Sequence, residues 1–211
     1  MVTSDLLEEI GQKETDKGEI VNRVIRNPEL IPEIIEGLRD KKARIKYGCA
    51  KILRLLSEKK PEVLYPRFEF FAGLLDSENS FLKWDAIHVL GNLAAADSEG
   101  KFEKILDRYL DPIPGPVLIT AANTIGGTAK IALAKPAFTE RITGELLKVE
   151  KAKYQTDECR NVALEQTIDS FDRFFAQIED REPVIALVQR QLKNTRNATR
   201  KRAEKFLKKW G

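Results

Sequence analysis

The stretch Leu82–Leu93, which reads LKWDAIHVLGNL, contains the pattern that decides the fold of this chain. It places a small residue at Ala86 and an aliphatic residue at Leu90, four positions later and on the same face of a helix. The same pattern is found at four other places, where the small residue is Cys49, Ala121, Ala163 and Ala203. Successive small residues lie 37, 35, 42 and 40 residues apart. A repeat of this length indicates an all-helical array, in which these five side chains are expected to point into the core.

The positions around the small residue repeat as well. Three positions before it, the copies carry a basic residue in four cases and leucine in one: Lys46, Lys83, Leu118, Arg160 and Arg200. Four positions after it, the copies carry Leu53, Leu90, Ile125, Thr167 and Leu207. The small residue would let a neighbouring helix approach closely, and the residue one turn later would fill the core below it.

An apolar segment that is typical of a helix precedes each of these second helices. The first helices are expected at Pro28–Leu38, Pro61–Leu75, Lys101–Leu110, Pro136–Leu147 and Pro183–Leu192. Four of them begin with proline, which is tolerated in the first turn because its missing N–H needs no partner there. The two-helix unit resembles the HEAT repeat, an armadillo-type helical hairpin whose second helix carries the pattern V-R-x-x-A-x-x-A-L-G-x-L. The resemblance covers roughly residues 28–210.

This resemblance implies an all-α fold, a right-handed α-α superhelix of about five HEAT-like hairpins behind N-terminal capping helices. We expect a single domain over residues 1–211. Residues 1–27 would form the cap, with helices at Thr3–Gly11, capped by Thr3 or Ser4, and at Glu19–Arg26. The repeats are expected at 28–60, 61–98, 99–135, 136–180 and 181–211. In HEAT-like arrays the second helices line the concave surface, so the resemblance places a partner there.

Composition is ordinary for a helical protein, with 33% charged residues and a net charge of +3 in 211 residues. The two cysteines, Cys49 and Cys159, fall on predicted core faces without a pairing or metal spacing, which favours a reducing compartment such as the cytoplasm. The acidic N-terminus is not typical of a signal peptide. The weakly charged stretch Pro112–Ala134 has too many prolines and glycines for a membrane span, so no membrane partner is expected.

The sequence contains no phosphate-binding glycine loop, nucleophile elbow or zinc spacing. His88 is its only histidine, and no second ligand stands at a suitable spacing, so a surface or packed histidine is favoured over a metal ligand. We therefore expect no metal, no cofactor and no enzymatic activity.

The favoured function is a scaffold that holds a protein partner along the concave face, in an oligomeric state that the sequence does not specify. Six residues of the second helices are predicted to contact the partner: Lys83, Trp84, His88, Asn92, Asn123 and Glu165. A low-charge patch lies at the centre of the array, at Thr120, Asn123, Thr124 and Gly127. It is either a groove for a peptide or helix or a site of tight interhelical packing, and both readings stay open.

The last predicted helix is strongly basic. It carries Arg202 and the predicted basic patch, which consists of Arg196, Arg200, Lys201, Lys205, Lys208 and Lys209. Only Glu204 opposes them, so the helix sums to +6. Nucleic-acid phosphates or an acidic partner could bind there. The alternative is a solvated capping helix whose cations suit the C-terminal end of the helix dipole.

An alternative function follows from Trp84 and Asp85. DNA glycosylases for alkylated bases exist with a HEAT-like fold, and they use aromatic residues and an aspartate beside basic residues. A nucleic-acid-binding or base-excising protein is therefore the second hypothesis, with the basic helix as a further contact. Against it, Trp84 falls at the repeat position of Tyr47 and Ile119, which is consistent with an ordinary packing position.

Overall fold

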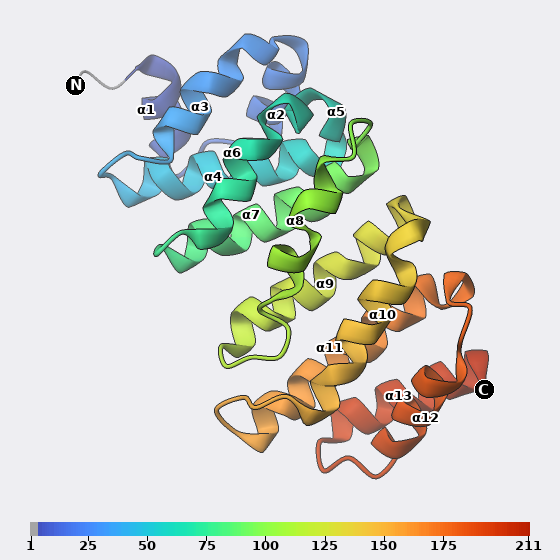
Figure 1. Cartoon of the computed structure of the whole chain (residues 1–211). Coiled ribbons are helices and arrows are strands. Elements are labelled where there is room, and N and C mark those ends of the chain that lie inside the picture. The colour runs from blue at the N-terminus through green and yellow to red at the C-terminus, as the bar shows by residue number, and fades with distance from the viewer. Residues whose placement is uncertain (1–3) are drawn as a thin grey trace. The chain divides into compact units, whose positions relative to one another are not determined.

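The computed structural model describes residues 4–211, which form helices joined by short turns, without a strand among them (Figure 1). The predicted all-α class is therefore confirmed. Residues 1–3 lie outside the described part, and with them the prediction that Thr3 caps the first helix. The chain divides into two compact units, the first ending at Lys101 and the second beginning at Phe102. A single domain over residues 1–211 stays a prediction.

The first unit begins with the two helices of the predicted cap, α1 (Asp5–Gly11) and α2 (Lys17–Arg26). The Ser4 hydroxyl caps α1 by accepting a hydrogen bond from the Leu7 amide. Both helices pack on α4 (Ala43–Lys59). The inward face of α2 consists of Ile20, Val21 and Val24, which are buried.

Two hairpins follow in the first unit. The first joins η1 (Pro28–Leu30) and α3 (Ile31–Gly37) to α4. The second contains α5 (Pro61–Leu64), η2 (Tyr65–Arg67), α6 (Phe68–Gly73), η3 (Leu74–Asp76), α7 (Ser80–Leu93) and η4 (Ala94–Ala96). The single helix predicted at Pro61–Leu75 is thus wrong. Pro66 lies in its middle and lacks the N–H that an α-helix needs there, so the segment breaks into short α and 3-10 turns.

The second helices of the first unit, α4 and α7, pack side by side and run parallel, as polar contacts at successive heights demonstrate. The side-chain amide of Asn79 donates a hydrogen bond to the Tyr47 hydroxyl over 3.4 Å. Further along, Arg54 Nη1 lies 3.4 Å from Asp85 Oδ1. Near the C-terminal ends of the two helices, the side-chain amide of Asn92 donates a hydrogen bond to the Ser57 hydroxyl over 2.9 Å.

The second unit repeats this plan. After α8 (Lys101–Leu110) come α9 (Leu118–Ala134), η5 (Pro136–Phe138), α10 (Thr139–Leu147), η6 (Lys148–Lys151), α11 (Asp157–Phe174), η7 (Phe175–Gln177), α12 (Glu182–Gln191) and α13 (Asn197–Trp210). α9 packs on α11, and α11 packs on α13. Among residues 4–211, no helix is both long and apolar enough to cross a membrane.

The small residues of the repeat behave as predicted. Cys49, Ala86, Ala121, Ala163 and Ala203 are all at most 1% exposed. Thr167, which stands where other copies have an aliphatic side chain, is also buried, and its hydroxyl donates to the Ala163 carbonyl over 2.9 Å. The internal hydrogen bond lets a polar residue occupy this core position. The repeat pattern therefore identifies the inward face of every second helix.

Candidate functional site

The outward face of α7 is a row of partly exposed side chains. Phe81, Trp84, Asp85, His88 and Asn92 stand three, four and seven residues apart along the helix, on one face. All five are half-buried or exposed, whereas the intervening residues that face inward, such as Ala86, are buried. Three predicted contact residues, Trp84, His88 and Asn92, are therefore accessible and aligned. The fourth on this helix, Lys83, is half-buried beside them.

Three rings from the two second helices of the first unit form one cluster, which we call the α4–α7 aromatic cluster: Tyr47, Phe81 and Trp84. The centroids of Tyr47 and Phe81 lie 5.3 Å apart, and those of Phe81 and Trp84 lie 5.2 Å apart. Phe81 is 58% exposed and Tyr47 is 37% exposed. Large apolar side chains with this exposure are uncommon enough to mark an interaction surface when they stand together.

The position shared by Tyr47, Trp84 and Ile119 is not a buried packing position. Ile119 is 53% exposed, and Trp84 is half-buried. The sequence-based interpretation also missed Phe81. Its signal was available, since Phe81 stands five residues before Ala86, where the copy on α4 has the exposed Arg44. The other copies have Pro116, Glu158 and Ala198 at this position, so only α7 places an aromatic residue there, and its exposure indicates a contact surface.

Asp85, which lies next to the aromatic cluster, already forms an ion pair within the first unit. Its carboxylate pairs with Arg54, and burial raises the pKa of Asp85 while the Arg54 guanidinium opposes that rise. The pair ties α7 to α4. In the first unit, then, Asp85 has a structural partner that also accounts for its charge.

A strip of cations flanks the aromatic cluster on α4. Arg44 and Lys51 are seven residues apart and therefore lie on the same side of the helix, and both are exposed. Tyr47 stands between them, turned toward α7. Lys17 of α2 reaches the same region, because its Cε would lie 3.7 Å from a Cβ built on Gly48. We call Arg44, Lys51 and Lys17 the α4 cation strip.

In the second unit the predicted low-charge patch divides between surface and core. Thr120 and Asn123 are half-buried on the outer side of α9, whereas Thr124 and Gly127 are buried. A Cβ on Gly127 would lie 1.9 Å from the hydroxyl of Tyr109, so Gly127 is a packing position. The packing reading is therefore right for Thr124 and Gly127, and a groove at Thr120 and Asn123 stays a prediction.

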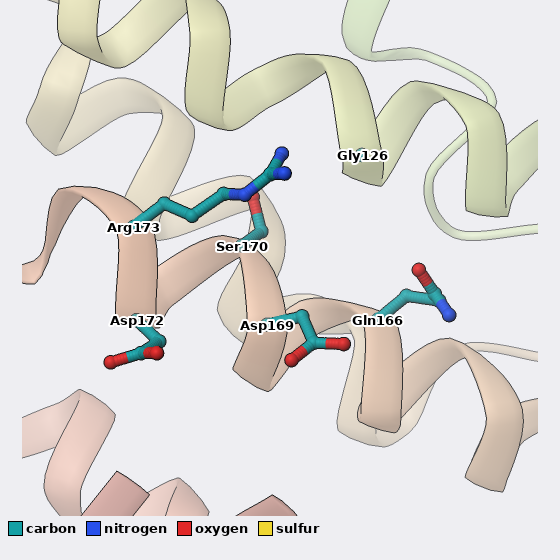
Figure 2. Close-up of a pocket in the computed structure, with 6 residues that line it drawn as sticks. All are labelled: Gly126, Gln166, Asp169, Ser170, Asp172 and Arg173. Carbon is teal, nitrogen blue, oxygen red and sulfur yellow. The ribbon is translucent and has the colours of Figure 1, made fainter.

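A pocket of about 300 Å³ lies between α9 and α11. Figure 2 shows Gln166 and Arg173 of α11 reaching toward the side of α9, which carries Gly126, whereas Asp169 and Asp172 point away from it. The Ser170 hydroxyl donates to the Ile125 carbonyl over 3.0 Å, so it joins the helices. Burial raises the pKa of Asp169, and the Arg202 guanidinium opposes this.

The basic patch of α13 faces the acids of α11. Arg196 pairs with Glu158 at 2.9 Å and with the predicted contact residue Glu165 at 3.2 Å. Arg202 lies 2.7 Å from Asp169, and Lys209 lies 2.8 Å from Asp172. Two of the six residues of the patch, Arg196 and Lys209, are therefore neutralised by α11, as is Arg202 beside them.

The remaining cations of α13 differ in their surroundings. The Arg200 guanidinium donates to the carbonyls of Asn194 and Thr195, at 2.7 and 2.9 Å. Lys201, Lys205 and Lys208 are exposed, and none of the three forms a salt bridge with any of residues 4–211. Arg200 also keeps its full charge, since carbonyl groups do not neutralise it, but it is half-buried, and only the three lysines carry their charge fully exposed. The α13 helix is thus a weaker site for phosphates than its composition suggests.

Comparisons with protein-family models and with curated proteins give no match. Among solved structures, the chain is similar to the designed armadillo repeat protein YIII(Dq)4CqI, with a TM-score of 0.58. The two chains are 14% identical, and the match covers 96% of this chain and 90% of that one. At this identity the likeness shows the fold alone. Together with the buried small residue of every repeat, it shows that the chain is an armadillo-type helical-repeat solenoid.

Proposed function

We propose that this solenoid is a non-enzymatic scaffold that binds a protein partner through the outward faces of its second helices. The observation that carries the proposal is the α4–α7 aromatic cluster. Its rings come from two consecutive hairpins, and Tyr47 and Phe81 are exposed while Trp84 is half-buried. That these helices line a concave surface, and that residues 1–211 form one array, are parts of the proposal.

The energetics favour a partner over bare solvent. Removing an exposed phenylalanine from water gains about 1.5–3 kcal/mol. Aromatic residues in a well-packed patch are also the side chains that dominate binding energy in protein interfaces. Because Phe81 packs on both Tyr47 and Trp84, the cluster has a defined geometry before a partner arrives. Little ordering entropy would then oppose binding.

The predicted contact residues extend this surface along α7. The Asn92 side chain is oriented by its hydrogen bond to Ser57, and His88 stands between Asn92 and Trp84 on the same face. A backbone segment lying along α7 could hydrogen-bond to both. Asn123 and Glu165 belong to the second unit. Both stand two positions after the small residue of their repeat, as His88 does, and this shared position supports a role in contacting the partner.

The two free cysteines support the cytoplasm as the proposed compartment. Neither Cys49 nor Cys159 forms a disulfide, and Cys49 is fully buried. Disulfide-free small domains are typical of reducing compartments.

A selection from a displayed library of peptides tests the function. The wild-type chain is expected to enrich a family of related sequences, and the double variant Tyr47→Ser, Phe81→Ser is expected to lose that family. The control is Leu192→Ser, which removes a 40% exposed leucine that follows a first helix. The control should enrich the same family as the wild type. Equal enrichment by the double variant, or no enrichment by the wild type, would overturn the proposal.

A further inference from the structure

We infer that the segment bound at the α4–α7 face is acidic, with carboxylates that bracket a hydrophobic side chain. The inference rests on the proposed function and names the chemistry of its partner. The hydrophobic side chain would contact the α4–α7 aromatic cluster, and the carboxylates would meet the α4 cation strip. Two features that lie side by side, exposed rings and unmatched cations, support it.

The cations are placed to face a ligand. Arg44 and Lys51 lie within about 20° of each other around the helix axis, at 100° per residue, and Tyr47 stands between them in the sequence. Arg44 also lines a pocket of about 580 Å³ between the end of α1 and the start of α4. Neither Arg44 nor Lys51 forms a salt bridge with any of residues 4–211.

Lys17 and Lys51 repel each other. Burial, followed by the charge of Lys51, lowers the pKa of Lys17. Lys17 is held in place because its ammonium donates to the carbonyl of Ile10 over 2.6 Å and also to that of Gln12. An anionic group between the two ammonium groups would relieve the repulsion, since opposite charges at such distances attract even near a surface.

Two acids near the strip are paired with other cations: Glu9 with Arg23 at 2.7 Å, and Asp85 with Arg54. Two others keep their charge. Asp40 accepts a hydrogen bond from the neutral backbone amide of Lys42 over 2.7 Å, and Glu8 lines the same pocket as Arg44. Lys42 lines that pocket as well, so the cations of this surface outnumber the two acids and its net charge stays positive.

The spacing defines the ligand further. Seven residues of helix place Arg44 and Lys51 about 10.5 Å apart along the axis, at 1.5 Å per residue. An extended chain covers that length in about three residues, at roughly 3.3 Å each. Side chains of an extended chain alternate between its two faces, so carboxylates that point to the same side are two or four residues apart, about 6.6 or 13 Å. Two acids four residues apart, with a hydrophobic side chain midway on the same face, would meet both cations and the aromatic cluster together.

The ring geometry favours a peptide over single-stranded nucleic acid. Successive bases stack on aromatic faces. The rings of Tyr47 and Phe81 are inclined by 57°, and those of Phe81 and Trp84 by 68°. The rings of the cluster are therefore steeply inclined to one another, and they offer no parallel faces on which successive bases could stack. Such an arrangement suits a protruding leucine or phenylalanine side chain.

Fluorescence anisotropy on the full chain tests the inference. The probes are short labelled peptides with a central Phe-Leu pair and flanks of Asp and Glu, of Lys and Arg, or of Gln and Ser, beside a short oligo(dT). The acidic peptide is expected to bind best, with an affinity that falls as salt is raised. The variant Arg44→Glu, Lys51→Glu should weaken it by about tenfold or more. The variant Arg67→Glu, Lys104→Glu changes the net charge equally at two exposed sites elsewhere and should bind like the wild type.

Each other outcome overturns the inference. Equal or tighter binding of the neutral or basic peptide would show that the face binds peptides without selecting acids. Tighter binding of oligo(dT) would assign the face to nucleic acid. If none of the peptides binds while library-selected peptides do, the acidic partner is wrong and the proposed function stands. If neither kind binds, both fail. Circular dichroism of each variant shows whether its fold is intact.

Discussion

The hydroxyl of Tyr109 on α8 lies directly against Gly127 on α9, where a Cβ would come within 1.9 Å of the oxygen. Both residues are buried, so neither the ring nor the helix has room to move aside. The variant Gly127→Ala is therefore expected to lower the free energy of unfolding by about 1–3 kcal/mol, the usual cost of overpacking. Urea unfolding followed by circular dichroism measures the change.

The neighbouring glycine is a matched control. A Cβ on Gly126 would meet no atom within 4 Å, and Gly126 lies in the same helix. Gly126→Ala should raise the free energy of unfolding by about 0.5–1 kcal/mol, because alanine loses less backbone entropy in a helix. Equal effects of the two substitutions would contradict the close contact at Tyr109.

The two cysteines are expected to differ in reactivity. Burial raises the pKa of the Cys49 thiol to about 12, whereas Cys159 is partly exposed near the start of α11. Because the thiolate is the reacting species, a thiol reagent at pH 8 should modify Cys159 quickly and Cys49 only after denaturation. Mass spectrometry of the labelled chain counts the modified sites, and Cys159→Ser should abolish the fast phase. Rapid labelling of Cys49 in the native chain would show that this core opens.

The attachment of α13 is expected to weaken in acid. Burial acts to raise the pKa of Asp172, but hydrogen bonds from Lys209 and from the Trp210 indole, at 2.8 and 2.7 Å, bring it below its ordinary value of 3.8. A carboxyl whose pKa is lowered by folding stabilises the folded state fully above its unfolded pKa. That stabilisation disappears as the pH falls below 3.8 through the lowered folded value.

The variant Asp172→Ala isolates this contribution. At pH 7 it should lower the free energy of unfolding by about 1 kcal/mol, the usual worth of such hydrogen bonds, and by less near pH 3. In a Trp84→Phe background, Trp210 is the only tryptophan left, so its fluorescence follows α13 alone. A difference between variant and parent that does not shrink with falling pH would contradict the role of the carboxylate.

Duplex DNA should bind the chain weakly. Four residues of the α13 patch, Arg200, Lys201, Lys205 and Lys208, lack a salt-bridge partner within residues 4–211. With about 0.9 counterions released per phosphate contact, four contacts limit the slope of log K against log salt to about −3.6. Filter binding over a salt series measures it.

Removing the acids that face the patch should strengthen DNA binding. The triple variant Glu165→Gln, Asp169→Asn, Asp172→Asn leaves Arg202 and Lys209 uncompensated, while Arg196 keeps its ion pair with Glu158. Its salt slope is expected to steepen toward about −5.4, the value for six contacts. A steep slope already in the wild type would revive the nucleic-acid hypothesis, and no change in the variant would show that the ion pairs do not shield the helix.

The repeat pattern predicted the class of fold and the inward side of every second helix, because the small residue is buried in all five copies. Cys49 in the first unit and Ala203 in the second were both identified in this way, although Leu207, one turn after Ala203, is only half-buried. The break at Pro66 was also visible in the sequence, but the apolar residues around it outweighed the proline in the interpretation.

What could not be predicted depends on how neighbouring helices are aligned. The pairing of Arg202 with Asp169 requires knowing which turn of α13 faces which turn of α11. The periodicity of a sequence predicts which face of a helix is buried, but it does not predict how far the helix is shifted along its axis relative to a neighbour. For the same reason the contact of Tyr47 with Phe81, residues 34 positions apart, had no signature in either helix alone.

The α4–α7 aromatic cluster takes one ring from the first hairpin and two from the next, so it exists only at their junction. Neither hairpin, transferred alone into another array, would contain the whole α4–α7 aromatic cluster. An engineered chain in which an extra hairpin is inserted at Lys60 would keep every repeat intact and still separate Tyr47 from Phe81. If the cluster binds the partner, binding specificity would depend on which hairpins are neighbours, and a change in the order of the hairpins would change it.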